Sequence, residues 1–113
     1  MEPKREQTFD KQFNVIKQYI VRGKNRDKKG VLISCLSDDL STIQVGYSLC
    51  SKNDTFDKYF GIFIAFQRAE KSVNKTSIII PHSIRSDFAK FLAKSQRYFK
   101  DKKLPDWTIS YKK

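Results

Sequence analysis

At 113 residues the chain can build one hydrophobic core but not two, so we expect a single domain over residues 1–113. Its 23 Lys and Arg against 12 Asp and Glu give a net charge of +11, which makes nucleic acid the first partner to consider, although such a charge also serves solubility alone. No apolar run approaches the ~20 residues that span a membrane, and none follows the charged first residues, so we expect no membrane partner and a cytoplasmic location.

The N-terminal region fits two secondary structures. We expect residues 1–10 to be flexible. Over residues 8–22, one set of apolar residues has helical spacing after a Thr8 cap, and an overlapping set alternates as in a strand. The density of β-branched residues favours a strand over residues 12–22, and a helix stays open as the alternative.

A segment flanked by two glycines, Gly23–Gly30, follows this region and predicts a loop that leads into the next strand. It is strongly basic, with Asp27 as its only acidic residue, and its glycines allow it to reach outward. We therefore expect this loop to be the first segment to contact phosphates. Its four basic residues are Lys24, Arg26, Lys28 and Lys29.

A strand and a turn come next. Val31–Leu36 is apolar and β-branched, which predicts a strand, and the Asp- and Ser-rich segment Ser37–Ser41 predicts a turn rather than an acid-base or metal site. A hairpin that turns there places Cys35 near Gln44. Cys35 and Cys50 then lie apart, so we expect no disulfide between them, and their spacing makes a poor metal site.

Two apolar runs in the central stretch Ser41–Lys71 predict two further strands. The first run alternates and leaves Gly46 and Ser48 as a shallow strip, where either a helix or a nucleic-acid backbone can approach; we favour the helix. The second run, Ile62–Phe66, is apolar at every position, which predicts a strand buried on both faces. The four predicted strands can form an antiparallel meander.

The last third of the chain predicts one long amphipathic helix. Ile78–Ile80 leads into Pro81, which is typical of a helix start, and Leu104 and Pro105 end the helix near Lys103. The final residues, 105–113, alternate as a short strand or a tail packed on the sheet. The helical residues at apolar spacing are Ile84, Phe88, Phe91, Leu92, Ser95 and Phe99.

These elements predict an α+β fold: an antiparallel meander sheet of four to five strands with one long amphipathic helix packed across it. The segment SIIIPHSIRSDFAKFLAKSQRYF, in this order after several strands, resembles single-stranded-DNA-binding transcriptional regulators of the PUR-repeat and Whirly-like families. Those families bind single strands on a curved sheet and dimerise through helices, so the resemblance implies binding at the basic loop and sheet edge and leaves a homodimer open. It is carried by Ile78, Ile80, Phe88, Phe91 and Leu92.

The central pattern is also similar to small uncharacterised proteins of tailed phages. This similarity implies a viral origin, and hence the host cytoplasm as location, but no particular activity. It is carried by Gly46, Ser48, Cys50, Asp54, Phe56, Lys58, Gly61, Ala65 and Arg68.

We expect a non-enzymatic nucleic-acid-binding protein, specific for single-stranded DNA or RNA rather than for duplexes, with no cofactor and no metal. The sequence has no helix-turn-helix, zinc-finger or Walker pattern. Basic side chains would contact phosphates and aromatic rings would stack on bases, although aromatic residues near a strand are more often core. Besides the loop residues, the candidates are Lys52, Lys58, Tyr59, Phe60, Arg68 and Lys71.

Two other classes of function stay open. One is a small viral interaction protein that docks on a host machine, such as the transcription apparatus, and inhibits or redirects it; its positive charge would then meet an acidic protein surface. The other is a small nuclease that uses Asp54, Asp57 and Glu70, although no motif fixes the geometry of these carboxylates.

Overall fold

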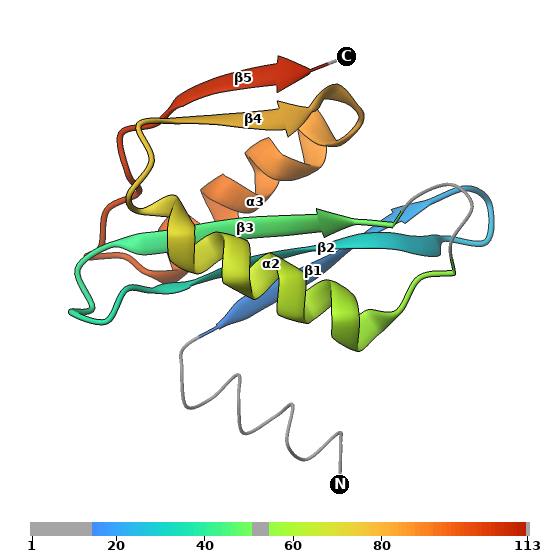
Figure 1. The fold of residues 1–113 in the computed structure, drawn as a ribbon, viewed down its shortest axis with the longest axis horizontal. Helices are drawn as coiled ribbons and strands as arrows, with labels where there is room; N and C mark the ends of the chain where they lie inside the picture. The colour runs from blue at the N-terminus through green and yellow to red at the C-terminus, as the bar shows by residue number, and fades with distance from the viewer. Residues whose placement is uncertain (1–14, 51–54, 113) are drawn as a thin grey trace, which may run out of the picture.

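The computed structural model describes residues 15–50 and 55–112, which form an α+β fold (Figure 1). Within this part, three strands make an antiparallel sheet, two strands make a small parallel sheet, and two α-helices complete the fold. Each of these helices is too short or too polar to cross a membrane. The elements are β1 (Ile16–Arg22), β2 (Asp27–Leu36), β3 (Ile43–Leu49), α2 (Lys58–Ser72), β4 (Ser77–Pro81), a 3-10 helix (His82–Ile84), α3 (Arg85–Tyr98) and β5 (Thr108–Lys112).

The first three predicted strands are confirmed. β1, β2 and β3 form an antiparallel meander, and Cys35 on β2 lies opposite Gln44 on β3, as the predicted hairpin requires. β1 covers residues 16–22 of the strand predicted over 12–22, and residues 12–14 lie outside the described part of the chain.

The turn between β2 and β3 is built by short polar side chains. The carboxylate of Asp39 accepts hydrogen bonds from the hydroxyls of Ser41 and Ser37, each at 2.7 Å, and from the backbone N–H of Ser41 at 3.0 Å. These bonds, those from Ser41 first, lower the pKa of Asp39 to about 2 because they stabilise the charged carboxylate. The prediction of a turn rather than an acid-base site at these aspartates agrees with this arrangement.

The predicted fourth strand, Ile62–Phe66, is wrong, because this run lies inside helix α2. The helix begins at Lys58 because Asp57 caps it: the Asp57 side chain accepts a hydrogen bond from the N–H of Phe60 at 3.1 Å. The meander therefore has three strands instead of four to five, and the described chain has two α-helices instead of one. The buried residues of α2 recur every three or four positions and are Gly61, Ala65, Ala69 and Ser72.

Gly46 and Ser48 lie beneath α2, which confirms the preference for a helix over this strip. A Cβ atom on Gly46 would overlap the backbone of Ala65 and Ala69, so only glycine lets the helix come this close. The hydroxyl of Ser48 donates a hydrogen bond to the carbonyl of Gly61 at 2.8 Å. The small residues of β3 therefore set the position of α2 on the sheet.

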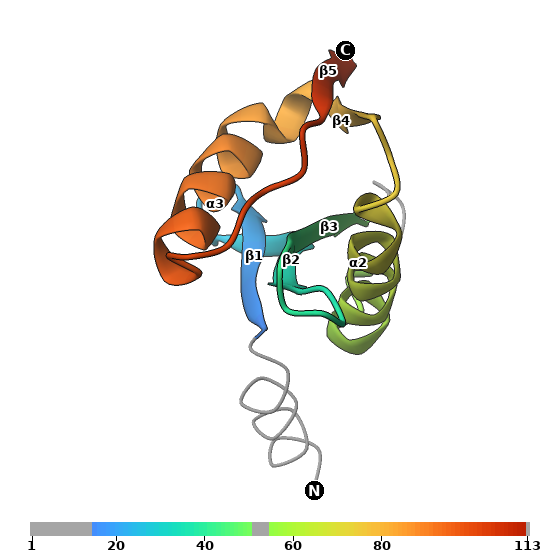
Figure 2. The same ribbon diagram turned by 90° about the vertical axis from the view of Figure 1, so that its left-hand side faces the viewer.

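Helix α3 covers the opposite face of the same sheet, so the sheet lies between two helices (Figure 2). The predicted apolar face of this helix is confirmed, because Phe88 and Phe91 are buried in one core with Ile20 and Leu32 of the sheet. The helix is shorter than predicted, since it ends at Tyr98. Both faces of the three-stranded sheet are therefore covered, and its edges, loops and helices are what face solvent.

The predicted C-terminal strand is present as β5, but it does not join the meander. β5 pairs with β4 in parallel, in the register Ile78 to Ile109 and Ile80 to Tyr111. The two strands lie at one end of α3 and form a second, separate sheet (Figure 1). Of the two alternatives left open for residues 105–113, the strand is present, and it pairs with β4 instead of extending the meander.

Candidate nucleic-acid interface

The outer face of α2 carries large aromatic side chains. Gly61, Ala65 and Ala69 are turned toward the sheet, so residues on the other side of the helix point away from it. Tyr59 is 49% exposed and Phe60 is 62% exposed. From the sequence, aromatic residues near a strand were expected to be core more often than exposed. Tyr59 and Phe60 are exposed because their segment is a helix, and the buried side of this helix is made of small residues.

Phe63 belongs to the same surface and was missed by the sequence prediction. It is 57% exposed and follows Tyr59 by one helical turn, so the two rings lie on neighbouring positions of one face. Helical spacing from Tyr59 would have identified Phe63, but the strand assignment hid this spacing. We refer to Tyr59, Phe60 and Phe63 as the aromatic face of α2.

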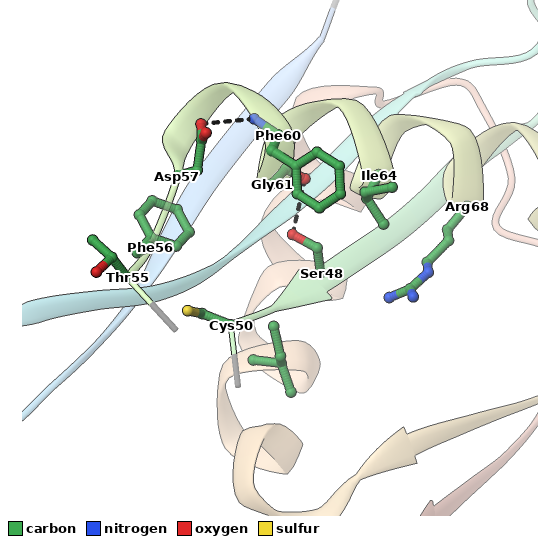
Figure 3. A pocket seen from close by; sticks show the side chains of 10 residues that line it. Ser48, Cys50, Thr55, Phe56, Asp57, Phe60, Gly61, Ile64 and Arg68 are labelled. Carbon is green, nitrogen blue, oxygen red and sulfur yellow. Dashed lines mark hydrogen bonds between the residues drawn. The ribbon is translucent and has the colours of Figure 1, made fainter. Parts of the chain in front are cut away.

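A pocket of about 530 Å³ opens beside the aromatic face, between the end of β3 and the first turns of α2 (Figure 3). Phe60 and Arg68 project from the same side of the helix along this pocket, with Ile64 between them. Its volume is within the range of about 300–1,000 Å³ that is typical of small-molecule sites. The lining residues are Ser48, Leu49, Cys50, Thr55, Phe56, Asp57, Phe60, Gly61, Ile64 and Arg68.

Arg68 is held in place by the edge of β3. Its guanidinium donates a hydrogen bond to the carbonyl of Tyr47 at 3.0 Å and lies over the Tyr47 ring at 5.5 Å from the centroid. One such bond leaves further N–H donors of the guanidinium for a ligand. The prediction placed Arg68 at the end of a strand, whereas it lies within α2 and reaches back to the strand.

Lys58 is next to the aromatic face as well. Its ammonium group lies 4.9 Å from the centroid of the Tyr59 ring, at the first residue of α2. A cation over an aromatic ring is stabilised by the ring quadrupole. The predicted pair of a phosphate-binding lysine and a stacking tyrosine is therefore adjacent in the structure.

The predicted basic loop is shorter than expected. Gly23 and Arg26 have positive φ values of 81° and 55° and close a tight turn, with the N–H of Arg26 bonded to the carbonyl of Gly23 at 3.1 Å. Lys24 and Arg26 are exposed at this turn, whereas Lys28 and Lys29 are already part of β2. The strand extends to Asp27 because it pairs with Arg22 of β1.

Lys28 connects this hairpin with the start of α2 through two aromatic rings. Its ammonium group lies 4.7 Å from the centroid of the Tyr19 ring. Tyr19 in turn meets Phe56 edge to face, at 6.1 Å between centroids, and Phe56 lines the pocket. Lys28 is therefore linked to the pocket lining through the rings of Tyr19 and Phe56 and does not itself line the pocket, whereas the sequence placed it in a free loop.

Two of the predicted residues are not part of this cluster. Lys71 lies in the last turn of α2, ~20 Å along the helix axis from Lys58 at 1.5 Å per residue. Lys52 lies outside the described residues. The structure thus brings together Lys28, Lys58, Tyr59, Phe60 and Arg68 along the first three turns of α2, with Lys29 next to Lys28 on β2 and with Lys24 and Arg26 at the tip of the β1–β2 hairpin.

The carboxylates of the nuclease hypothesis are not brought together. Asp57 caps the start of α2, and Glu70 lies in the last turns of the same helix, so about 13 residues of helix separate them, ~20 Å. Asp54 lies outside the described residues. Among the described residues, no group of three or more His, Cys, Asp or Glu side chains could hold a metal ion.

The cysteines are not joined by a disulfide, as predicted. Cys35 belongs to β2 and is buried against α2. Its thiol donates a hydrogen bond to Oε1 of Gln44 at 3.4 Å. Burial, and the nearby charge of Glu70, raise the pKa of the Cys35 thiol to about 12. Cys50 lies beside the pocket, at the end of β3.

Comparisons of the chain with protein-family models, with curated proteins and with solved structures find no match.

Proposed function

We propose that the protein binds single-stranded nucleic acid through the side of α2 that carries Phe60 and Arg68. The observation that carries this proposal is the pocket along which the exposed ring of Phe60 and the guanidinium of Arg68 both project. Exposed rings stack on unpaired bases, and guanidinium groups bind phosphates. A ring and a guanidinium group along one pocket can therefore bind a ligand in which flat bases alternate with negatively charged phosphates.

The spacing of these two groups suits a short stretch of one nucleic-acid strand. Eight residues of helix separate Phe60 from Arg68, which is ~12 Å along the axis. A base stacked on Phe60 and a phosphate at Arg68 would thus belong to neighbouring parts of one strand. A duplex keeps its bases stacked on one another, so it offers no free base face to Phe60; this favours single strands.

The flanking cations support the same ligand. Lys58 lies beside the ring of Tyr59, and Lys28 lies over the ring of Tyr19, which contacts Phe56 of the pocket lining. A backbone that leaves the pocket toward the hairpin would meet Lys24 and Arg26 at the exposed turn. Both faces of the sheet are covered by helices. The nucleic-acid strand would therefore bind beside α2, at the pocket near the end of β3, and not on a face of the sheet.

The test is a titration of labelled single strands of about 12 nucleotides, within the range one such site covers, against protein variants. Phe60→Leu keeps an apolar side chain but removes the ring face, and should weaken binding roughly 10-fold or more, since stacking contributes about 1–3 kcal/mol per base. Phe60→Trp should retain binding. Ile79→Ala, which truncates a side chain that is also exposed but lies on β4, is the control.

An unchanged affinity of Phe60→Leu, or equal binding of a duplex of the same length, would contradict the proposal. DNA and RNA strands of the same sequence are compared in the same titration. The 2′-hydroxyl offers an additional donor and acceptor, so a difference between the two identifies the natural ligand class.

One observation favours docking on a host protein as a second candidate. Phe63 is exposed but does not line the pocket, and three exposed aromatic rings on one helix are typical of a protein interface. The two candidates respond differently to Phe63→Ala: strand binding should change little, whereas a protein complex that buries the aromatic face should weaken strongly.

A further inference from the structure

A second basic surface lies on α3. Lys90, Lys94 and Arg97 are all exposed, and their spacing of four and three residues places them on one side of the helix, over ~10 Å of its length. Tyr98, which is 61% exposed, follows directly after them. We refer to Lys90, Lys94 and Arg97 as the basic strip of α3.

The charge of the basic strip is not neutralised by the described part of the chain. Asp87, the acidic residue of α3, is bound by the guanidinium of Arg22 from β1. Within the described part of the chain, Lys94 donates a hydrogen bond to the neutral amide oxygen of Gln18, at 3.3 Å. No described carboxylate lies within ion-pair distance of the three cations.

The basic strip and the pocket face away from each other. α2 and α3 cover opposite faces of the β1–β2–β3 sheet, so the sheet lies between the two surfaces (Figure 2). A single short strand seated on α2 leaves the strip of α3 free. The strip has the charge that binds a phosphate backbone, and Tyr98 supplies a ring at its end.

We propose that the basic strip of α3 binds the phosphate backbone of a second nucleic-acid segment, so that one protein molecule bridges two strands. The proposal rests on the proposed function for the first strand, at α2. The second contact is electrostatic and independent of sequence, because three flexible cations bind phosphates without reading bases.

The experiment is a two-strand capture assay. One strand of about 12 nucleotides is fixed on a surface and saturated with protein, and capture of a second, labelled strand is measured. The variant Lys90→Gln, Lys94→Gln, Arg97→Gln should lower the capture about 10-fold or more. The control variant Lys75→Gln, Lys103→Gln, Lys112→Gln removes equal charge from exposed residues elsewhere and should capture nearly as well as the wild type.

The first binding step is measured in the same assay, which separates the two proposals. If the fixed strand binds no protein, both proposals are wrong. If it binds protein but no second strand is captured, bridging is wrong and the proposed function stands. If the strip variant captures as well as the control variant, for example because a dimer presents two α2 sites, the strip is not the second site. If the strip variant loses the fixed strand as well, the strip belongs to the first site and bridging is again wrong.

Discussion

Gly46 is the residue on which the packing of α2 depends. Any side chain there would overlap the backbone atoms of Ala65 and Ala69, which cannot move without moving the helix. Gly46→Ala should therefore lower the free energy of unfolding by about 1–3 kcal/mol, the usual cost of overpacking a core. Urea unfolding followed by circular dichroism measures this loss, and an unchanged midpoint would show that α2 is not held at this distance.

The thiol of Cys35 makes a second prediction at the scale of a residue. Because burial raises its pKa from 9.0 to about 12, the folded protein holds this proton more tightly than the unfolded chain does. The contribution of the protonated Cys35 thiol to the stability of the fold is complete below pH 9.0, and it is lost as the pH rises from 9.0 toward 12. We expect thiol reagents at pH 8 to label Cys50 in the folded protein and Cys35 only after unfolding; rapid labelling of both thiols in the native state would contradict the buried position.

Gly46 and Ser48 show which parts of the packing can be predicted from the sequence. The small strip of Gly46 and Ser48 correctly indicated a helix, because close packing is the common reason for small residues in a strand. The same sequence could not identify that helix as the segment just beyond the next loop. Tyr59 and Phe60 are exposed because their segment is this helix. The sequence could therefore propose the two residues as candidates for stacking, but it could not show that their rings face solvent.

At the scale of elements, α2 and α3 offer a matched pair of phenylalanines. Phe91 of α3 is completely buried, whereas Phe63 of α2 is 57% exposed. Phe91→Ala should cost about 3–5 kcal/mol of stability, the usual effect of deleting a buried phenylalanine. Phe63→Ala should change the stability by less than about 0.5 kcal/mol, as surface substitutions do. Chemical denaturation of both variants is the measurement, and equal effects would mean that the burial of the two helices is not as described.

The two helices differ in how clearly the sequence predicts them, for one physical reason. α3 has basic residues on its outer side, so its apolar residues recur with the helical period and the pattern was recognised. α2 has small residues inside and aromatic residues outside, so Ile62–Phe66 is apolar all round and looks like a buried strand. A helix with an exposed apolar face hides its own periodicity, and that face is the part that we assign to binding.

At the scale of the whole molecule, the sheet stops at three strands because the outer edge of β3 is closed. Backbone groups on this edge are bonded by atoms from other elements, which leaves no free ladder for β4. These long-range contacts have no local sequence signal, and they explain why the predicted meander was too large. The bonds are Ile43 N to the Lys103 carbonyl (2.9 Å), Val45 N to Ser72 Oγ (3.2 Å), and the Arg68 guanidinium to the Tyr47 carbonyl (3.0 Å).

The net charge of +11 predicts how binding depends on salt. Each phosphate contact on a single strand releases a counterion, so log affinity should fall with log salt at a slope of about −0.7 per contact. Replacing Lys24, Arg26, Lys28 and Lys29 by Ala should reduce the magnitude of this slope by roughly 2–3 units, since all four are exposed at one end of the β1–β2 hairpin.

The melting temperature of this variant should stay nearly constant, because exposed side chains at a hairpin end contribute little to the core. The control replaces Lys75, Lys103 and Lys112 by Ala, exposed residues away from the hairpin and from the pocket at the start of α2. If the field of the whole protein attracts the strand, both variants flatten the slope in proportion to the charge removed. If the hairpin contacts phosphates directly, as we expect, the hairpin variant flattens it far more, and equal slopes in both variants would place the contacts elsewhere.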